Sequence, residues 1–292
     1  MNFLKALFGS SETSAEDEEK EAGRKQFDLM KYDGVRAMKM GQFDYAVRCF
    51  EEALKVQDDL EIHDYLSRAF VRLDRLNEAV EQLQVLARAE PENAGVQLQL
   101  AHVCYMNEDY AAMAEAAEQA IALDGTLAQG YLLYAQAALG QGDLINGIAR
   151  LTKAIALDET LADARLLRAQ TLLKMGDVAG AAADSEWLTE HVGDHEDVLM
   201  LSARVAHAAG NDDQALLIYN KVVELNPFML EAYAERGKIC YERGDKQQAE
   251  ADMQKVLELN PQQLADVSGD YSAEGVEHRV RQAYSNLNPL GL

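Results

Sequence analysis

Small residues return along this chain at an almost constant spacing, with one step of 33 residues followed by five steps of 34. They are Gly34, Ser67, Ala101, Ala135, Ala169, Ala203 and Gly237. A second column with the same steps is apolar throughout: Ala53, Leu86, Ala120, Ala154, Leu188, Val222 and Val256. A third column is mostly small: Ala46, Ala79, Met113, Gly147, Ala181, Ala215 and Ala249. Self-similarity at a fixed period of this size indicates an array of repeats, in which each unit packs on its neighbours.

Each repeat is expected to be a pair of helices. Small side chains at a fixed phase on two successive helices let the helices approach to the short end of the ~8–10 Å interaxial range. Glycine marks the turn inside five of the pairs, and a neighbouring Asp or Asn can cap the second helix. These glycines are Gly41, Gly142, Gly176, Gly210 and Gly244. Pro91, Pro227 and Pro261 stop second helices, because proline cannot continue a helix.

The small columns, the glycine at the hairpin turn and the Asn-Pro at the repeat end resemble the tetratricopeptide repeat family. The resemblance implies an all-α fold, a right-handed α-solenoid of helix-turn-helix repeats with first helices on a concave face. The seven tandem repeats would cover residues 27–261, as 27–59, 60–93, 94–127, 128–161, 162–195, 196–229 and 230–261. Ala117 and Ser185 replace the family's large residue on the second helix, so those two hairpins are expected to pack less well and to open first.

Two terminal segments lie outside the repeats. Residues 1–26 are rich in acidic side chains and are expected to form a flexible segment. Residues 262–292 break the pattern and then form an expected helix with one apolar side: Val276, Val280, Ala283, Tyr284 and Leu287. We expect this helix to cap the last hairpin, because solenoids need polar-faced caps. Docking of this segment in a concave groove is the alternative.

Charge and cysteine content narrow the function. The chain has 50 acidic and 27 basic residues, a net charge of −23 that repels phosphate backbones and argues against nucleic acid as the main ligand. Cys49, Cys104 and Cys240 are far apart and form no CxxC pair, so a disulfide framework is not expected. The chain start lacks a secretory pattern, and no apolar run approaches ~20 residues. These features predict a cytoplasmic protein without integral membrane insertion.

Motifs for catalysis, cofactors or metals are missing from the sequence. It contains no phosphate-cradling glycine loop, no Gly-x-Ser-x-Gly elbow and no His-Glu-x-x-His helix. His191 and His195 stand four residues apart, but Gly193 between them predicts a turn rather than a zinc-binding helix. We therefore expect no enzyme activity, no cofactor and no metal site.

The first helices are expected to present an apolar track beside a polar one on the concave face, by the 3.6-residue period. The apolar track is Leu98, Leu132, Leu166 and Met200, continued by Tyr105, Leu139, Leu173 and Tyr241. The polar row is Arg68, His102, Gln136, Gln170, Arg204 and Lys238. Such a strip can pair with the carbonyls or carboxylates of a peptide while the apolar residues accept its side chains. The alternative is that the leucines pack within the array.

These patterns predict a scaffold or adaptor that binds a peptide or protein segment in the concave groove of repeats three to six. Acidic residues at both ends of the groove edge, such as Asp28 and Glu231, favour a partner with apolar and basic residues. The alternative is a self-associating structural or assembly factor. Its terminal segments, with Phe3, Leu4 and Phe8 at the start, would mediate oligomerisation or membrane-proximal attachment.

Overall fold

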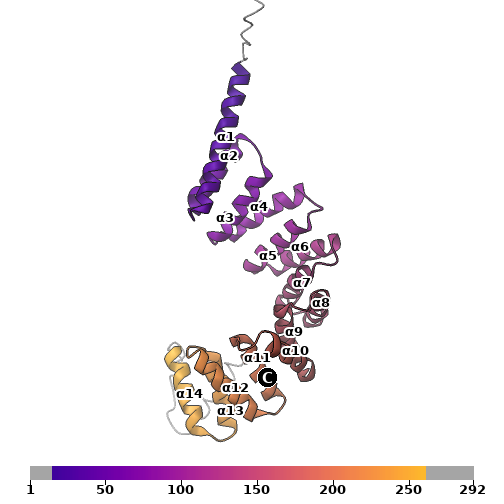
Figure 1. The fold of residues 1–292 in the computed structure, drawn as a ribbon, viewed down its shortest axis with the longest axis vertical. Coiled ribbons are helices and arrows are strands. Elements are labelled where there is room, and N and C mark those ends of the chain that lie inside the picture. Colours follow the sequence, from indigo (N-terminus) through magenta and orange to yellow (C-terminus); the bar gives the residue numbers. More distant parts are fainter. Residues whose placement is uncertain (1–14, 261–292) are drawn as a thin grey trace, which may run out of the picture. The chain divides into compact units, whose positions relative to one another are not determined.

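The computed structural model describes residues 15–260, and every regular element within them is an α-helix (Figure 1). The helices are α1 (Ala15–Lys39), α2 (Phe43–Val56), α3 (Leu60–Arg72), α4 (Leu76–Ala89), α5 (Ala94–Met106), α6 (Tyr110–Leu123), α7 (Ala128–Gly140), α8 (Leu144–Leu157), α9 (Ala162–Lys174), α10 (Val178–His191), α11 (Glu196–Ala208), α12 (Asp212–Leu225), α13 (Leu230–Glu242) and α14 (Lys246–Leu259). The chain divides into two compact units, with the boundary between Asp143 and Leu144. The all-α prediction is confirmed, and each expected repeat contains two of these helices.

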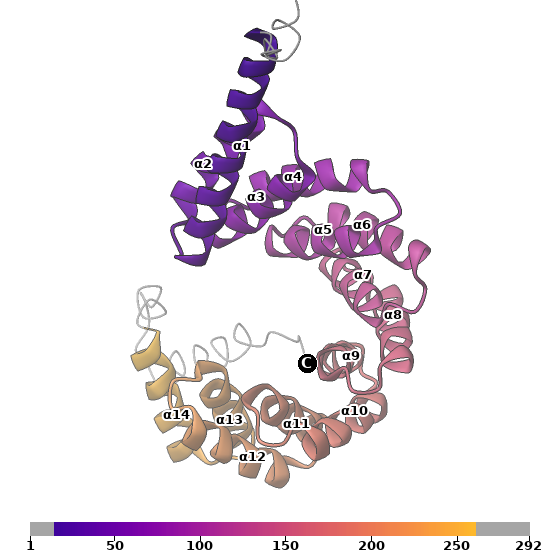
Figure 2. The same cartoon turned by 45° about the horizontal axis from the view of Figure 1, so that its top comes forward.

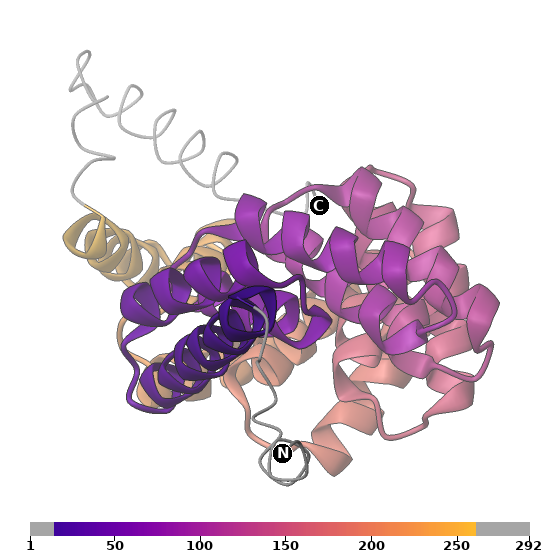
Figure 3. The same ribbon diagram turned by 90° about the horizontal axis from the view of Figure 1, so that it is seen from above.

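Consecutive helices of the first unit pack as hairpins (Figures 2 and 3). Helix α1 lies against α2, α3 against α4, and α5 against α6. Each hairpin meets the next through the pairs α2–α3, α4–α5 and α6–α7, and α7 also packs on α5. The interior of the unit includes the fully buried side chains of Phe50, Leu66 and Leu83.

The second unit repeats this arrangement. Helix α9 lies against α10, α11 against α12, and α13 against α14. The hairpins are joined through α8–α9, α10–α11 and α12–α13. Its core includes the fully buried side chains of Leu188, Leu201 and Tyr219. Both units are therefore built by the same packing of each hairpin on its sequence neighbours.

The three predicted columns are buried at every position. Their size requirement is visible at Gly34 in α1, where a methyl group would lie 2.5 Å from Cε1 of the Phe50 ring. Phe50 itself is fully buried in α2, so the ring has little room to move away. A small residue at this phase therefore lets the two helices of a hairpin meet.

The turns inside the hairpins need a left-handed backbone. Five predicted turn glycines have φ between 72° and 84°, the lowest at Gly41 and the highest at Gly244. In repeats two and three the same position is occupied by Asp74, with φ of 58°, and Glu108, with φ of 55°. The expected caps are confirmed, for example where the Asp177 carboxylate accepts a hydrogen bond from the Gly180 amide at 2.9 Å.

The N-terminal boundary differs from the prediction. Helix α1 begins at Ala15, so residues 15–26, predicted to lie outside the repeats, belong to the first helix of the repeats. This stretch is rich in Ala, Glu, Lys and Arg, which have high helix propensity, and Glu21 and Lys25 form an i,i+4 ion pair at 2.8 Å. Residues 1–14 and 261–292 lie outside the described part, and so do the Phe3–Phe8 segment and the predicted C-terminal capping helix. No helix of the described part is long and apolar enough to span a bilayer.

Candidate functional site

Three residues of the predicted apolar track are buried in the core instead of lining an open groove. Leu132 is 3% exposed, Met200 5% and Leu173 0%. Leu173 belongs to a core cluster with Leu201 of the following repeat, and Met200 to one with Ile239. The first helix of the next repeat thus covers Leu173 and Met200. For them, the alternative of packing within the array is correct.

Arg204, predicted as a ligand donor, is committed to a pair inside the second unit. Its guanidinium donates to the Glu235 carboxylate at 2.6–3.0 Å, and the Tyr219 hydroxyl donates to the same carboxylate at 2.5 Å. Burial disfavours the charged form of Arg204, but the hydrogen bonds and the charge of Glu235 outweigh this and raise its pKa. Arg204 therefore joins α11 to α13.

The remaining predicted residues keep part of their surface. His102 and Tyr105 are exposed. Seven others are half-buried: Leu98, Gln136, Leu139, Leu166, Gln170, Lys238 and Tyr241. Those on α5 and α7 belong to the first unit, and those on α9 and α13 to the second. The residues of the expected groove of repeats three to six thus belong to two compact units.

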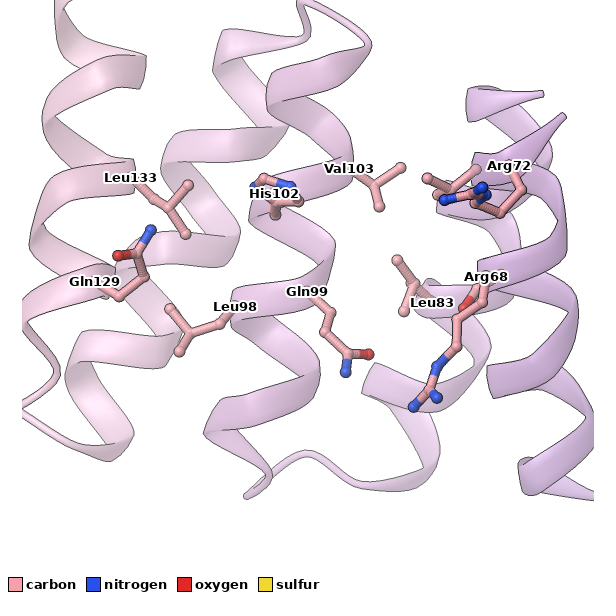
Figure 4. Close-up of a pocket in the computed structure, with 11 residues that line it drawn as sticks. Arg68, Arg72, Leu83, Leu98, Gln99, His102, Val103, Gln129 and Leu133 are labelled. Atoms are coloured by element: carbon pink, nitrogen blue, oxygen red, sulfur yellow. The ribbon is translucent and has the colours of Figure 1, made fainter. Parts of the chain in front are cut away.

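A pocket of about 460 Å³ lies among α3, α5 and α7 of the first unit (Figure 4). Its lining residues are Ser67, Arg68, Val71, Arg72, Leu83, Leu98, Gln99, His102, Val103, Gln129 and Leu133. We call it the basic pocket. Of the predicted apolar track and polar row, it brings together Leu98, His102 and Arg68. Arg72 was missed, although its position four residues after Arg68 places it on the same face of the helix.

The basic pocket has an apolar floor and a polar rim. Leu83, Val103 and Leu133 are buried beneath it, while Leu98 is half-buried at its side. The rim is formed by exposed side chains: Arg68, Arg72, Gln99, His102 and Gln129. Such a combination can bury an apolar side chain while hydrogen bonds orient the chain that carries it.

The local charge of this pocket opposes that of the whole chain. Its lining contains two guanidinium groups and no carboxylate. Arg68 pairs with Asp64, one turn earlier on α3, at 2.8 Å. The guanidinium of Arg72 lies 5.3 Å from the centre of the Phe43 ring. The rim therefore favours negative charge or carbonyl groups on a ligand.

A second pocket of about 360 Å³ lies near the first turns of α3 and α5. Its lining residues are Leu60, Glu61, Asp64, Leu86, Glu90, Asn93, Gly95, Val96 and Gln99. We call it the acidic pocket. Hydrogen bonds from Lys31 and Tyr65, with the charge of Lys31, lower the pKa of Glu61. The two pockets share Gln99.

Possible metal ligands and nucleophiles elsewhere in the described residues are the histidines and the three cysteines. Among residues 15–260, no cluster of three or more His, Cys, Asp or Glu side chains is arranged to hold a metal ion. The His191 ring stacks on Trp187 at 4.2 Å between ring centres. All three cysteines are buried and free, and burial raises the pKa of the Cys104 thiol to about 11. Such a thiol is a poor nucleophile at neutral pH.

Comparison with known proteins identifies the repeat. Residues 166–229 and 230–263 match models of the tetratricopeptide repeat. A tetratricopeptide repeat protein from Parabacteroides merdae has a TM-score of 0.66 at 14% identity, covering 88% of this chain and 98% of its own.

Two further solved structures share the fold. PilW, a type IV pilus biogenesis factor, has a TM-score of 0.58 at 18% identity, covering 69% of this chain and 94% of its own. The protein YrrB has a TM-score of 0.53 at 15% identity, covering 62% and 94%. Among curated proteins, none matches this sequence. Residues 166–263 therefore match the tetratricopeptide repeat, and the paired helices and buried columns of residues 15–260 are similar to that fold.

Proposed function

We propose that this chain is a non-catalytic scaffold that binds a segment of another protein on its first helices, with the basic pocket as the anchor point. The tetratricopeptide fold supports protein binding in general. YrrB, which shares the fold, is described as having an unusual peptide-binding site. The observation that carries the proposal is a pocket of about 460 Å³ with a buried apolar floor beneath an exposed polar rim.

The anchor is smaller than the groove predicted from the sequence. Leu98 and His102 keep their proposed roles, as apolar wall and rim donor. Tyr105, Gln136 and Leu139 are the neighbouring positions on α5 and α7 that a longer segment would reach. In the second unit, Leu166, Gln170, Lys238 and Tyr241 are retained as further contact positions. A cytoplasmic location is part of this proposal.

The test replaces one wall residue of the pocket. Random peptides are selected on the immobilised full-length chain, and the affinity of an enriched peptide is measured for wild type and for Leu98→Glu. Because a charge would be placed at the apolar wall, we expect the affinity to fall by more than about tenfold. Leu123→Glu is the control, since Leu123 is an exposed leucine on α6 outside both pockets. Equal binding by the two variants, with unchanged helical circular dichroism, contradicts the proposal.

Self-association is the second candidate function. Leu29 and Tyr32 on α1 are 55% and 65% exposed, and their spacing places them on one face of the first helix of the array. Two such faces could pair in a dimer. Light scattering over a range of concentrations tests this, and a mass that stays monomeric at every concentration rejects it.

A further inference from the structure

The basic and acidic pockets lie side by side on α3 and α5, and their charges are opposite. The lining of the basic pocket includes Arg68 and Arg72 but no carboxylate. The lining of the acidic pocket includes Glu61, Asp64 and Glu90 but no basic residue. A single ligand that touches both pockets therefore meets a reversal of charge along the helix axis.

We propose that the bound segment is bipolar. An apolar residue next to an aspartate or glutamate occupies the basic pocket, and a lysine or arginine three or four residues away reaches the acidic pocket. This inference rests on the proposed function, because it specifies the chemistry of the segment bound there. It adds an acidic residue to the partner predicted from the sequence, which had apolar and basic residues.

Helix geometry sets the spacing between the two charges of the ligand. The midpoint of Glu61 and Asp64 and the midpoint of Arg68 and Arg72 are separated along α3 by about 11 Å, at 1.5 Å per residue. An extended peptide advances by about 3.3 Å per residue. Three or four residues therefore cover the distance.

The basic pocket suits an acidic side chain within a continuing segment. Asp64 engages the Nε and Nη2 groups of Arg68, which leaves other N–H donors of the guanidinium for a ligand carboxylate. The Arg72 guanidinium lies 5.3 Å from the centre of the Phe43 ring, an attraction that leaves its N–H donors for a ligand. The rim amides of Gln99 and Gln129 each combine a donor and an acceptor, which matches a peptide backbone passing over the pocket.

One lining carboxylate of the acidic pocket, that of Glu61, already pairs with a lysine of the chain. Lys31 places its Nζ atom 3.0 Å from Asp59 and 2.7 Å from Glu61. Glu90, which also lines the pocket, accepts a hydrogen bond from the neutral side chain of Asn93 at 2.6 Å. Glu61, Asp64 and Glu90 together therefore form the partner of the ligand's lysine or arginine, and among the described residues no side-chain cation pairs with Glu90.

The experiment exchanges charges between protein and peptide. An enriched peptide from the random library is synthesised with an amidated C-terminus, and a second version carries lysine in place of its acidic residue. Both are titrated against the wild type, Arg72→Glu and Arg88→Glu, the last being an exposed arginine on α4 outside both pockets. We expect Arg72→Glu to weaken the acidic peptide by at least about tenfold and to favour the lysine version by a similar factor. Arg88→Glu should resemble wild type.

A separate arm tests the basic end of the ligand. Glu90→Gln should weaken only peptides that carry lysine or arginine three or four residues from the acidic position. Enriched peptides without this pattern, or an Arg72→Glu variant that does not discriminate between the two versions, overturn the bipolar ligand. If such peptides still lose affinity on Leu98→Glu, the proposed function survives. Insensitivity to Leu98→Glu, or a library without binders, contradicts both.

Discussion

Two glycines of α1 provide a matched test of why small residues recur in this chain. A methyl group at Gly34 would lie 2.5 Å from Cε1, 2.7 Å from Cδ1 and 2.9 Å from Cζ of Phe50. A methyl group at Gly23, on the same helix, would meet only Cγ1 of Val56 at 3.7 Å, an ordinary contact. Gly→Ala in a helix gains about 0.5–1 kcal/mol from backbone entropy at either position. Only Gly34→Ala also incurs the overpacking cost of about 1–3 kcal/mol.

We therefore expect Gly23→Ala to stabilise the α1–α2 hairpin and Gly34→Ala to destabilise it, with a difference of about 1–3 kcal/mol. Amide hydrogen exchange of α1 and α2 measures this free energy locally, which matters because repeat arrays need not unfold in one step. Phe50→Leu should cost less stability in the Gly34→Ala background than in the wild type, because it removes the ring atoms that the added methyl group would contact. Equal stabilisation by both alanines would refute the close-packing explanation.

Five further substitutions test three local features of the fold, each by chemical denaturation followed by circular dichroism. Asp74→Gly and Glu108→Gly should each stabilise the folded chain by about 0.5–1 kcal/mol, because both residues have positive φ. Gly176→Ala should destabilise it by a similar amount, because Gly176 also has positive φ. Unchanged stability in all three variants would contradict this explanation of the turns. Gln97→Leu should stabilise the folded chain by about 1 kcal/mol, because Oε1 of this buried amide has no hydrogen-bond partner within the described residues. A loss of stability would contradict this and would indicate a partner outside those residues. Leu132→Ala should lower the free energy of unfolding by about 2–5 kcal/mol, because Leu132 is a buried core residue. A loss below about 0.5 kcal/mol would indicate that Leu132 lines an open groove instead.

The helices and their pairing could be predicted from the sequence because the signal is repeated. Each small column recurs at the same phase, and every member is buried. The helical start of α1 is harder to predict, because the acidic composition of residues 15–26 is typical of a flexible segment while their Ala, Glu, Lys and Arg residues favour a helix.

Side-chain exposure within one phase could not be predicted in this way. Leu98 and Leu132 occupy equivalent positions, yet Leu98 is half-buried beside a pocket and Leu132 is buried. Their burial depends on which side chains the neighbouring helices present, and those differ from repeat to repeat. The pairing of Arg204 with Glu235 likewise joins residues of successive repeats, which a reading along one helix does not reveal. The polar row indicated hydrogen-bonding capacity without indicating which members were already paired.

Methyl resonances observed during titration with a library-selected peptide test the central claim, that the face of α3, α5 and α7 binds a segment of another protein. The methyl groups of Val71, Leu98, Val103 and Leu133 line the basic pocket, whereas Leu201 is buried in the core of the second unit. We predict that the four pocket residues shift in a saturable manner and that Leu201 does not. Shifts confined to the second unit, or an unchanged spectrum at saturating peptide, would contradict the account.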